Sequence, residues 1–257
     1  MAAEVKLSAV LITKNAQAHL RECLATLAWC DEIVVLDSGS TDATAAICDA
    51  AGARFIVSPD WPGFGPQKNR ALELARGEWI FSVDADEICT PELRAEIERV
   101  MRANGSDQDA AAYQCARLSS FCGTFMRHGG WWPDRVTRVW RRGRARFSDD
   151  VVHECVIADG GIARLRAHLI HYTYDNLEQA LEKLNRYSTL GAEMAFKQGK
   201  RASLASALGR GAWAFARTYF LRLGLLDGAA GFQLALYNAQ TTYYKYLKLA
   251  YLSRPPR

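Results

Sequence analysis

Two carboxylates stand at alternate positions in residues 81–87, where the apolar run Trp79–Phe81 is followed by Asp84 and Asp86. A short run of bulky apolar residues is typical of a buried strand, and open α/β sheets bind ligands at the carboxyl ends of their strands. Side chains at i and i+2 of an extended segment point the same way. Two neighbouring carboxylates repel unless a cation or a proton lies between them. A divalent ion that also bridges substrate phosphates would be such a cation. An acidic loop without function is the alternative.

Another carboxylate, that of Asp37, ends the apolar segment Glu32–Asp37 and is followed by Ser38, Gly39 and Ser40. A carboxylate at a strand end can accept hydrogen bonds from ribose hydroxyls or a base N–H, and glycine permits close backbone approach. We expect this segment to bind a nucleoside. The alternative is that the cluster only caps the next helix.

A glycine-bearing loop, residues 63–67, leads into a predicted helix that carries Lys68 and Arg70. A helix N-terminus beside cationic side chains favours phosphate. The segment is not a Walker loop, because G-x-x-x-x-G-K-[ST] is absent. We expect a phosphate contact here, and a solvated helix face is the alternative.

A further acidic cluster, residues 149–154, contains Asp150, His153 and Glu154. A carboxylate can act as a general base, and histidine is a common metal ligand. Glu154 is the favoured base, Asp150 is the alternative base, and His153 is a candidate metal ligand or phosphate neighbour. A structural histidine is the simpler interpretation of His153 when the local sequence is taken alone.

Two adjacent tryptophans, Trp131 and Trp132, follow a pair of glycines. Aromatic rings suit the apolar C–H faces of sugars, so these residues are candidates for the acceptor side of a site, together with Arg135 and Arg138. Tryptophans that fill a core or anchor a loop would give the same pattern.

Apolar runs alternate with helical patterns over the first hundred residues, which predicts an α/β fold with a mostly parallel sheet and right-handed crossovers. Residues 58–66 contain three prolines and two glycines and are predicted to form an irregular loop. We expect a catalytic domain over 1–175 and a C-terminal helical region over 176–257. The expected strands are 8–13, 32–37, 54–57, 79–83, 111–118, 136–140 and 162–174, and the expected helices are 19–29, 44–51, 68–76 and 91–102.

The bulk composition is that of a globular protein with a net charge of +4, too small to indicate nucleic-acid binding. Its seven cysteines form no C-x-x-C pair, so we expect reduced thiols and neither a disulfide framework nor a zinc site. No apolar stretch approaches the length needed to cross a bilayer.

The C-terminal region mixes basic residues with aromatic and aliphatic ones, a pattern that suits an anionic membrane surface. The alternative is that these helices pack on the catalytic domain with their charges in water. The residues concerned are Lys197, Lys200, Arg201, Arg210, Arg217, Arg222, Tyr243, Tyr244, Lys245, Tyr246 and Lys248.

The order of these motifs resembles that of the family 2 glycosyltransferases with a GT-A fold, in particular the bacterial lipopolysaccharide inner-core β-1,4-glucosyltransferases. The resemblance covers residues 7 to about 175, and the segments 225–228 and 243–246 also look like that subgroup. It implies a nucleotide-sugar donor, with UDP-glucose the best candidate, a lipid-linked saccharide acceptor, a divalent metal (Mg²⁺ or Mn²⁺), and a place on the cytoplasmic face of the inner membrane. The donor site implied comprises Thr13, Asn15, Asp37, Ser38, Gly39, Lys68, Asn69, Arg70, Asp84 and Ala85.

In this resemblance Asp86 holds the metal, with His153 as a second candidate ligand, and the reaction is a single displacement with inversion. Many relatives place the catalytic carboxylate in a Glu-Asp pair at a helix start, whereas this chain offers His153-Glu154.

Three other classes can be weighed against this one. A haloacid-dehalogenase-type phosphatase needs Thr or Val two residues after the second Asp, where this chain has Ile88. A nucleotidyltransferase usually has a glycine-rich loop after its first strand, and residues 15–18 contain no glycine. A catalytically dead binding module would not need Asp84, Asp86 and Glu154 together.

Overall fold

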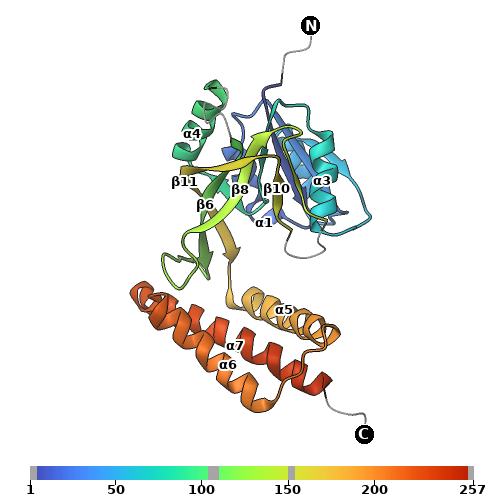
Figure 1. The fold of residues 1–257 in the computed structure, drawn as a ribbon. Helices are drawn as coiled ribbons and strands as arrows, with labels where there is room; N and C mark the ends of the chain where they lie inside the picture. The colour runs from blue at the N-terminus through green and yellow to red at the C-terminus, as the bar shows by residue number, and fades with distance from the viewer. Residues whose placement is uncertain (1–4, 104–109, 150–153, 254–257) are drawn as a thin grey trace. The chain divides into compact units, whose positions relative to one another are not determined.

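The computed structural model describes residues 5–103, 110–149 and 154–253, and they form two compact units (Figure 1). The first unit comprises residues 1–117 and 135–171, and the second comprises residues 118–134 and 172–257. The division falls within three strands, β6 (Ala110–Phe121), β8 (Asp134–Arg141) and β11 (Gly161–Tyr174). All the carboxylates and cations considered below for donor chemistry belong to the first unit.

Four parallel strands form one half of the main sheet, in the order β3-β2-β1-β4. They are β1 (Leu7–Thr13), β2 (Glu32–Asp37), β3 (Arg54–Val57) and β4 (Trp79–Ser82). The register pairs Thr13 with Asp37, so the carboxyl ends of β1 and β2 lie side by side. Strand β1 is buried along nearly its whole length, and its middle, Ala9 to Ile12, is continuously apolar, as expected for a strand covered on both faces.

Three helices connect these strands in the alternation that the sequence predicts, and a fourth follows later in the chain. They are α1 (Gln17–Thr26), α2 (Thr44–Ala50), α3 (Phe64–Leu74) and α4 (Pro91–Arg102). The side chain of Thr90 accepts a hydrogen bond from the backbone N–H of Leu93 and so caps α4. A central core cluster includes Val10, Leu36 and Trp140.

The other half of the sheet is mixed, in the order β8-β6-β11-β5. Strand β8 pairs antiparallel with β4, and β11 pairs antiparallel with the short strand β5 (Glu87–Cys89). Strand β7 (Thr124–Phe125) pairs with β6, and β9 (Ala145–Phe147) pairs with β10 (Val156–Ala158) in a separate two-stranded sheet.

The structure corrects two predicted helix boundaries. Helix α3 begins at Phe64, inside the predicted irregular loop, with Pro66 in its first turn. Proline is tolerated there because the first N–H groups of a helix have no intrahelical partner. Helix α1 ends at Thr26, three residues before the predicted end, and the Trp29 indole N–H then donates to the Thr26 carbonyl.

A second correction concerns residues 84–87, which form a turn and do not continue β4 as an extended segment. The turn is closed by a hydrogen bond from the Glu87 N–H to the Asp84 carbonyl, and the Glu87 carboxylate accepts from the Asp84 N–H. The premise that Asp84 and Asp86 point the same way is therefore wrong, and each carboxylate has its own partners.

The second unit is mainly helical. It contains α5 (Leu177–Lys197), α6 (Leu204–Ala216), the π-helical turn η1 (Arg217–Leu221), the 3₁₀ turn η2 (Gly224–Asp227) and α7 (Gly228–Leu252). Helix α7 packs against both α5 and α6. A core cluster joins Phe121, Tyr174 and Tyr237, whose two tyrosine hydroxyls lie 2.9 Å apart. Within the described residues, no helix combines the length and the apolar character needed to span a bilayer.

Candidate active site

Asp84 is the centre of a cluster of opposite charges at the end of β4. Its carboxylate lies 2.5 Å from Nη2 of Arg138 and 3.0 Å from Nζ of Lys68, and Arg117 Nη1 lies 3.9 Å away. Burial raises the pKa of Asp84, but the positive charges of Arg138, Lys68 and Arg117 outweigh that effect and hold the pKa well below its usual value. Asp84 therefore stays ionised throughout the physiological range.

Arg138 and Glu87 form a buried ion pair beneath Asp84. Glu87 is fully buried, and its Oε1 lies 2.5 Å from Arg138 and 3.2 Å from Arg117. Burial alone would lower the pKa of Arg138, but the charges of Asp84 and Glu87 raise it above its ordinary value. The Nε atom of Arg138 is buried without a hydrogen-bond partner. A buried donor without a partner costs free energy. The two carboxylates therefore hold Arg138 in place despite that cost.

Lys68 links Asp84 to Glu154. Its Nζ lies 3.0 Å from the Asp84 carboxylate and also 3.0 Å from Oε1 of Glu154, and the Lys68 side chain is only 9% exposed. The ammonium group lies over the Phe147 ring, 5.1 Å from its centroid. A candidate base and a candidate donor-site carboxylate are thus held on the same cation.

Asn69 holds the segment that leads to Glu154. Its side-chain amide donates to the Phe147 carbonyl at 2.9 Å and accepts from the Phe147 N–H at 2.8 Å. Both halves of the amide are used, so α3 and β9 are tied together next to Lys68. Asn69 was predicted to line the donor pocket, and the structure shows its side chain bound to the backbone of β9.

The Asp37 carboxylate organises the loop after β2. Its Oδ1 accepts from the N–H groups of Gly39 and Ser40, and its Oδ2 accepts from the hydroxyls of Thr13 and Ser40. Burial raises the pKa of Asp37, but these hydrogen bonds outweigh it and lower the pKa overall. A carboxylate has about four acceptor positions, and the loop uses all of them. These hydrogen bonds hold the loop itself, and the N-cap residue of α2, Ala43, makes no side-chain capping hydrogen bond, so the nucleoside role of Asp37 stays a prediction.

Asp86 lies apart from the cations that hold Asp84. Its Oδ2 is 3.6 Å from Nε2 of His171 on β11, and its side chain is 39% exposed. A carboxylate oxygen beside an imidazole nitrogen is a donor set that Mn²⁺ or Mg²⁺ accepts when substrate oxygens complete the coordination. The described residues contain no group of three or more His, Cys, Asp or Glu side chains that could hold a metal ion.

The remaining predicted site residues are distributed as follows. Asn15 accepts from the Thr41 N–H, and Ser38 accepts from the buried Gln67 amide. Arg70 pairs with Asp60 at 2.7 Å on the surface. Ala85 lies in the turn after Asp84.

On the predicted acceptor side, Trp131 and Trp132 belong to the second unit, whereas Arg135 is exposed in the first unit and Arg138 is buried there. Trp131 packs edge-on against Phe121 at 5.9 Å. The candidates Asp150 and His153 lie outside the described residues.

Four residues of the cluster were missed or predicted for another role. Glu87, Arg117 and His171 were not proposed, and Arg138 was placed on the acceptor side. Little in the local sequence marks these residues as part of a site, because Glu87 follows Asp86 directly and the other three lie on strands far along the chain. The pairing of β4 with β8 brings Arg138 to Asp84, the pairing of β5 with β11 brings His171 to Asp86, and Arg117 arrives on β6, which lies between β8 and β11.

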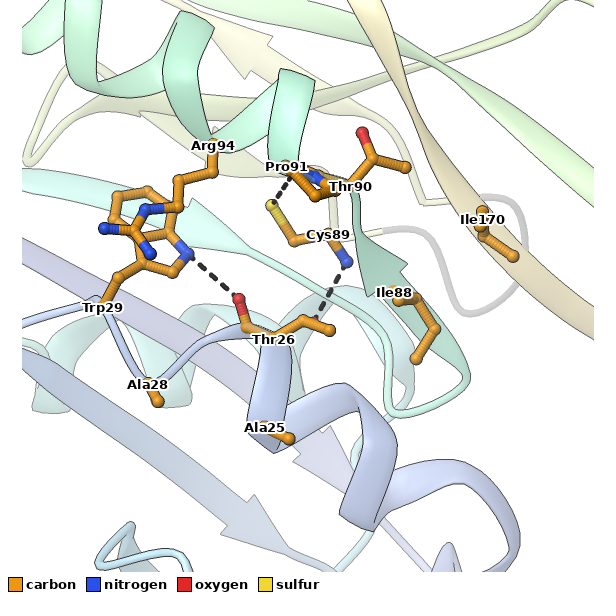
Figure 2. Close-up of a pocket in the computed structure, with 10 residues that line it drawn as sticks. All are labelled: Ala25, Thr26, Ala28, Trp29, Ile88, Cys89, Thr90, Pro91, Arg94 and Ile170. Carbon is orange, nitrogen blue, oxygen red and sulfur yellow. Dashed lines mark hydrogen bonds between the residues drawn. The ribbon is translucent and has the colours of Figure 1, made fainter.

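A separate hollow of about 520 Å³ opens on the first unit, and none of these carboxylates or cations lines it. Figure 2 shows the guanidinium of Arg94 over the indole of Trp29, 5.4 Å from its centroid, with Thr26 below the pair and Cys89 and Ile88 to its right. Burial raises the pKa of the Cys89 thiol to about 12, which makes it a poor nucleophile. None of the seven cysteines forms a disulfide in the structure.

The fold has a clear counterpart among solved structures. TarS from S. aureus, residues 1–349 solved in complex with UDP, aligns over 96% of this chain and 91% of that chain with a TM-score of 0.50 at 15% identity. Together with the parallel strands that present Asp37 and Asp84 at their carboxyl ends, this likeness defines the fold as that of a GT-A-type glycosyltransferase.

Sequence comparison gives the family. Residues 8–168 match the profile of glycosyl transferase family 2. The chain is 33% identical over 252 residues to the lipopolysaccharide core biosynthesis glycosyltransferase LpsC of Rhizobium meliloti (strain 1021), covering 93% of this chain and 90% of that protein. It is 32% identical over 263 residues to an uncharacterized glycosyltransferase of Rickettsia felis (strain ATCC VR-1525 / URRWXCal2), covering 96% and 89%. The chain belongs to glycosyl transferase family 2, and it is an enzyme that transfers a sugar.

Proposed function

We propose that this glycosyltransferase moves a hexose, with glucose the best candidate, from a UDP-sugar to a lipid-linked saccharide such as the lipopolysaccharide inner core, with inversion at the anomeric carbon. The lipopolysaccharide core role of the Rhizobium meliloti relative supports the acceptor class. The donor and the stereochemistry rest on the resemblance of the motifs and on the arrangement of charges around Asp84.

One observation carries the proposal: Lys68 lies 3.0 Å from both the Asp84 carboxylate and Glu154. A base must reach the hydroxyl that attacks the donor sugar, so it must lie beside the donor site. Lys68 gives Glu154 that position. The same ammonium group, with Arg117 and Arg138 behind it, supplies positive charge where a departing diphosphate gains negative charge.

The proposed chemistry is a single displacement. The acceptor oxygen forms a bond to the anomeric carbon as the bond from that carbon to the diphosphate oxygen breaks, and the hydroxyl proton passes to a Glu154 oxygen. Asp86, with His171 beside it, would hold a divalent cation, which neutralises charge on the diphosphate when bound. The protein's own contribution is to hold donor and acceptor in line, and such positioning is worth on the order of 7–11 kcal/mol at best.

We further propose that the enzyme works at the cytoplasmic face of the inner membrane as a peripheral protein, because its acceptor is lipid-linked. The basic and aromatic residues of the C-terminal region support this, since positive charge beside apolar side chains favours an anionic lipid surface.

The test compares Glu154→Gln with Asp150→Asn in a transfer assay at saturating UDP-glucose and inner-core acceptor. Glu154→Gln keeps the shape and removes the proton acceptor, so we expect donor binding to persist while turnover falls by roughly 10²–10⁴. Asp150→Asn should cost much less. Turnover of the wild type should also fall when EDTA replaces Mn²⁺. A dead Asp150→Asn with an active Glu154→Gln would show that the other carboxylate is the base.

A further inference from the structure

The turn between α6 and α7 exposes an unusual run of large apolar side chains. Five of the seven residues from 220 to 226, here called the apolar tip, have exposures between 41% and 65%. The five are Phe220, Leu221, Leu223, Leu225 and Leu226. Exposing so many neighbouring leucines to water costs free energy that burial would recover, and contiguous apolar patches of this kind mark interaction surfaces.

The apolar tip is fixed in place by hydrogen bonds at its base. Asp227 accepts from the backbone N–H groups of Arg127 and His128, and its other carboxylate oxygen lies 2.7 Å from Nδ1 of His128. The Gly129 N–H donates to the Arg222 carbonyl at 2.8 Å. A Cβ at Gly231 would overlap the Gly224 carbonyl oxygen, so the two glycines allow η2 to pack tightly on α7. The exposure is therefore a property of an ordered turn.

The apolar surface continues onto both helices that meet at the tip. Leu204, Leu208 and Trp213 of α6 and Phe232 and Leu236 of α7 are all exposed. Arg210 is the only charged residue in α6, and α7 has none before Lys245. A water-facing helix normally carries polar residues on its outer face, so these faces are unlike those of an ordinary surface helix.

Charge around the tip identifies the kind of surface that it fits. Residues 194–257 contain ten of the 32 Lys and Arg residues but only one of the 28 acidic residues, so this segment carries +9 and residues 1–193 carry −5. The one acid, Asp227, is only 8% exposed and is paired with His128. Two copies of the chain meeting through this face would bring like charges together, whereas an anionic lipid surface matches them.

We propose that the apolar tip inserts among the lipids of an anionic membrane, with Arg217 and Arg222 at the level of the headgroups. This rests on the membrane association proposed above and adds which residues enter the bilayer. The tip would supply a part of the binding that salt does not screen, because apolar burial in lipid does not depend on ionic strength.

The test is flotation of the full-length enzyme with phosphatidylcholine vesicles containing phosphatidylglycerol, in low and high salt. The tip variant is Leu221→Glu with Leu226→Glu. The matched control is Ile157→Glu with Ile162→Glu, which changes two exposed residues of the first unit. In high salt, we expect the tip variant to bind vesicles about tenfold or more weakly than the wild type. The control should float like the wild type. Leu221→Ser with Leu226→Ser serves as a milder pair, and circular dichroism checks folding.

The outcomes separate this inference from the proposed function. If the wild type binds vesicles and both tip variants bind equally well, insertion of the apolar tip is overturned, while membrane association itself stands. A wild type that binds no vesicles would overturn membrane association, and the inference with it. A tip variant that floats normally but loses a dimer seen for the wild type by light scattering would assign the tip to a second copy of the chain. Hydrolysis of UDP-glucose in solution should be unchanged in the tip variants, so a loss of that activity would point to misfolding.

Discussion

At the scale of single residues, the central question is how three carboxylates and three cations share one site. Glu87 and Arg138 are buried, while the Asp84 and Glu154 side chains keep 28% and 18% exposure. Glu87 and Arg138 thus form a buried ion pair, whereas the Asp84 and Glu154 carboxylates remain partly open to solvent. Buried charges persist only when each has a partner, so the stability of the fold should be sensitive to the loss of either Glu87 or Arg138.

Replacing Arg138 by Met should therefore destabilise the protein strongly. The change leaves the fully buried Glu87 with Arg117 alone, 3.2 Å away. Breaking a buried ion pair from one side typically costs 3–5 kcal/mol, and we expect roughly the lower end because Arg117 remains. Urea denaturation would measure the free energy of unfolding.

The double variant Arg138→Met with Glu87→Met is the control. Replacing both charges by apolar groups is often nearly neutral, so it should recover part of the loss, although Asp84 then also lacks its closest partner. Equal stability of Arg138→Met and the wild type would contradict the view that Arg138 is held by its charges.

At the scale of elements, the loop after β2 depends on a single carboxylate. Asp37→Asn keeps the shape but places an amide NH₂ where two of the four donors now point. We expect a loss of stability of about 1–3 kcal/mol, the scale of a buried polar group left unsatisfied. UDP itself should bind more weakly, because Gly39 and Ser40 would no longer hold their conformation. Calorimetric titration with UDP would measure this, and an unchanged affinity for UDP would exclude Asp37 from the nucleoside site.

The pH dependence of the free energy of unfolding should show whether the negative charge of Asp37 stabilises the fold. The pKa of Asp37 is lowered in the folded chain, so its ionised form stabilises the fold above the unfolded-state pKa, which is about 3.9. That contribution is lost as the pH falls through the folded pKa. The difference between wild type and Asp37→Asn should therefore narrow in acid, and a constant difference would mean that the charge itself contributes nothing.

Elements with a continuous local signal were predictable from the sequence. The strand ending at Asp37 has the predicted bounds, and the family and fold followed from the order of the motifs. The start of α3 differs because the prolines and glycines of residues 58–66 predict an irregular loop, whereas Pro66 is tolerated in the first turn of the helix. Strand β5 was missed because three residues are too few for a periodicity.

The predicted residues that belong to the observed cluster are Asp84, Lys68 and Glu154. Asp84 begins the turn that follows β4, and Lys68 lies within α3, which follows β3 and the segment 58–63. Arg138 and His171 arrive through antiparallel pairings with β4 and β5. Such pairings join residues some fifty or more positions apart, as in the bond between Arg138 and Asp84, and no local pattern encodes them.

At the scale of the whole molecule, charge is divided unevenly along the chain. A net charge of +4 hides a segment of +9 after residue 193 and a remainder of −5. Each Lys or Arg close to an anionic leaflet contributes about 1 kcal/mol, so a few of them give reversible binding. The exposed apolar tip would then add a contribution that depends on insertion and not on charge.

The electrostatic part of membrane binding should appear as a dependence of vesicle affinity on salt concentration. Binding to phosphatidylglycerol-containing vesicles should weaken steadily as salt rises from about 0.05 to 0.5 M, since the screening length falls below about 10 Å above 0.1 M. The variant Lys197→Gln with Lys200→Gln removes two exposed charges from the basic segment, and Arg164→Gln with Arg166→Gln removes two exposed charges from the first unit. We expect the first pair to lower affinity by about tenfold or more, because two charges contribute roughly 2 kcal/mol, and the second pair to have little effect. Equal binding to neutral and anionic vesicles, or equal losses in the two variants, would show that the uneven charge does not direct the enzyme to a membrane.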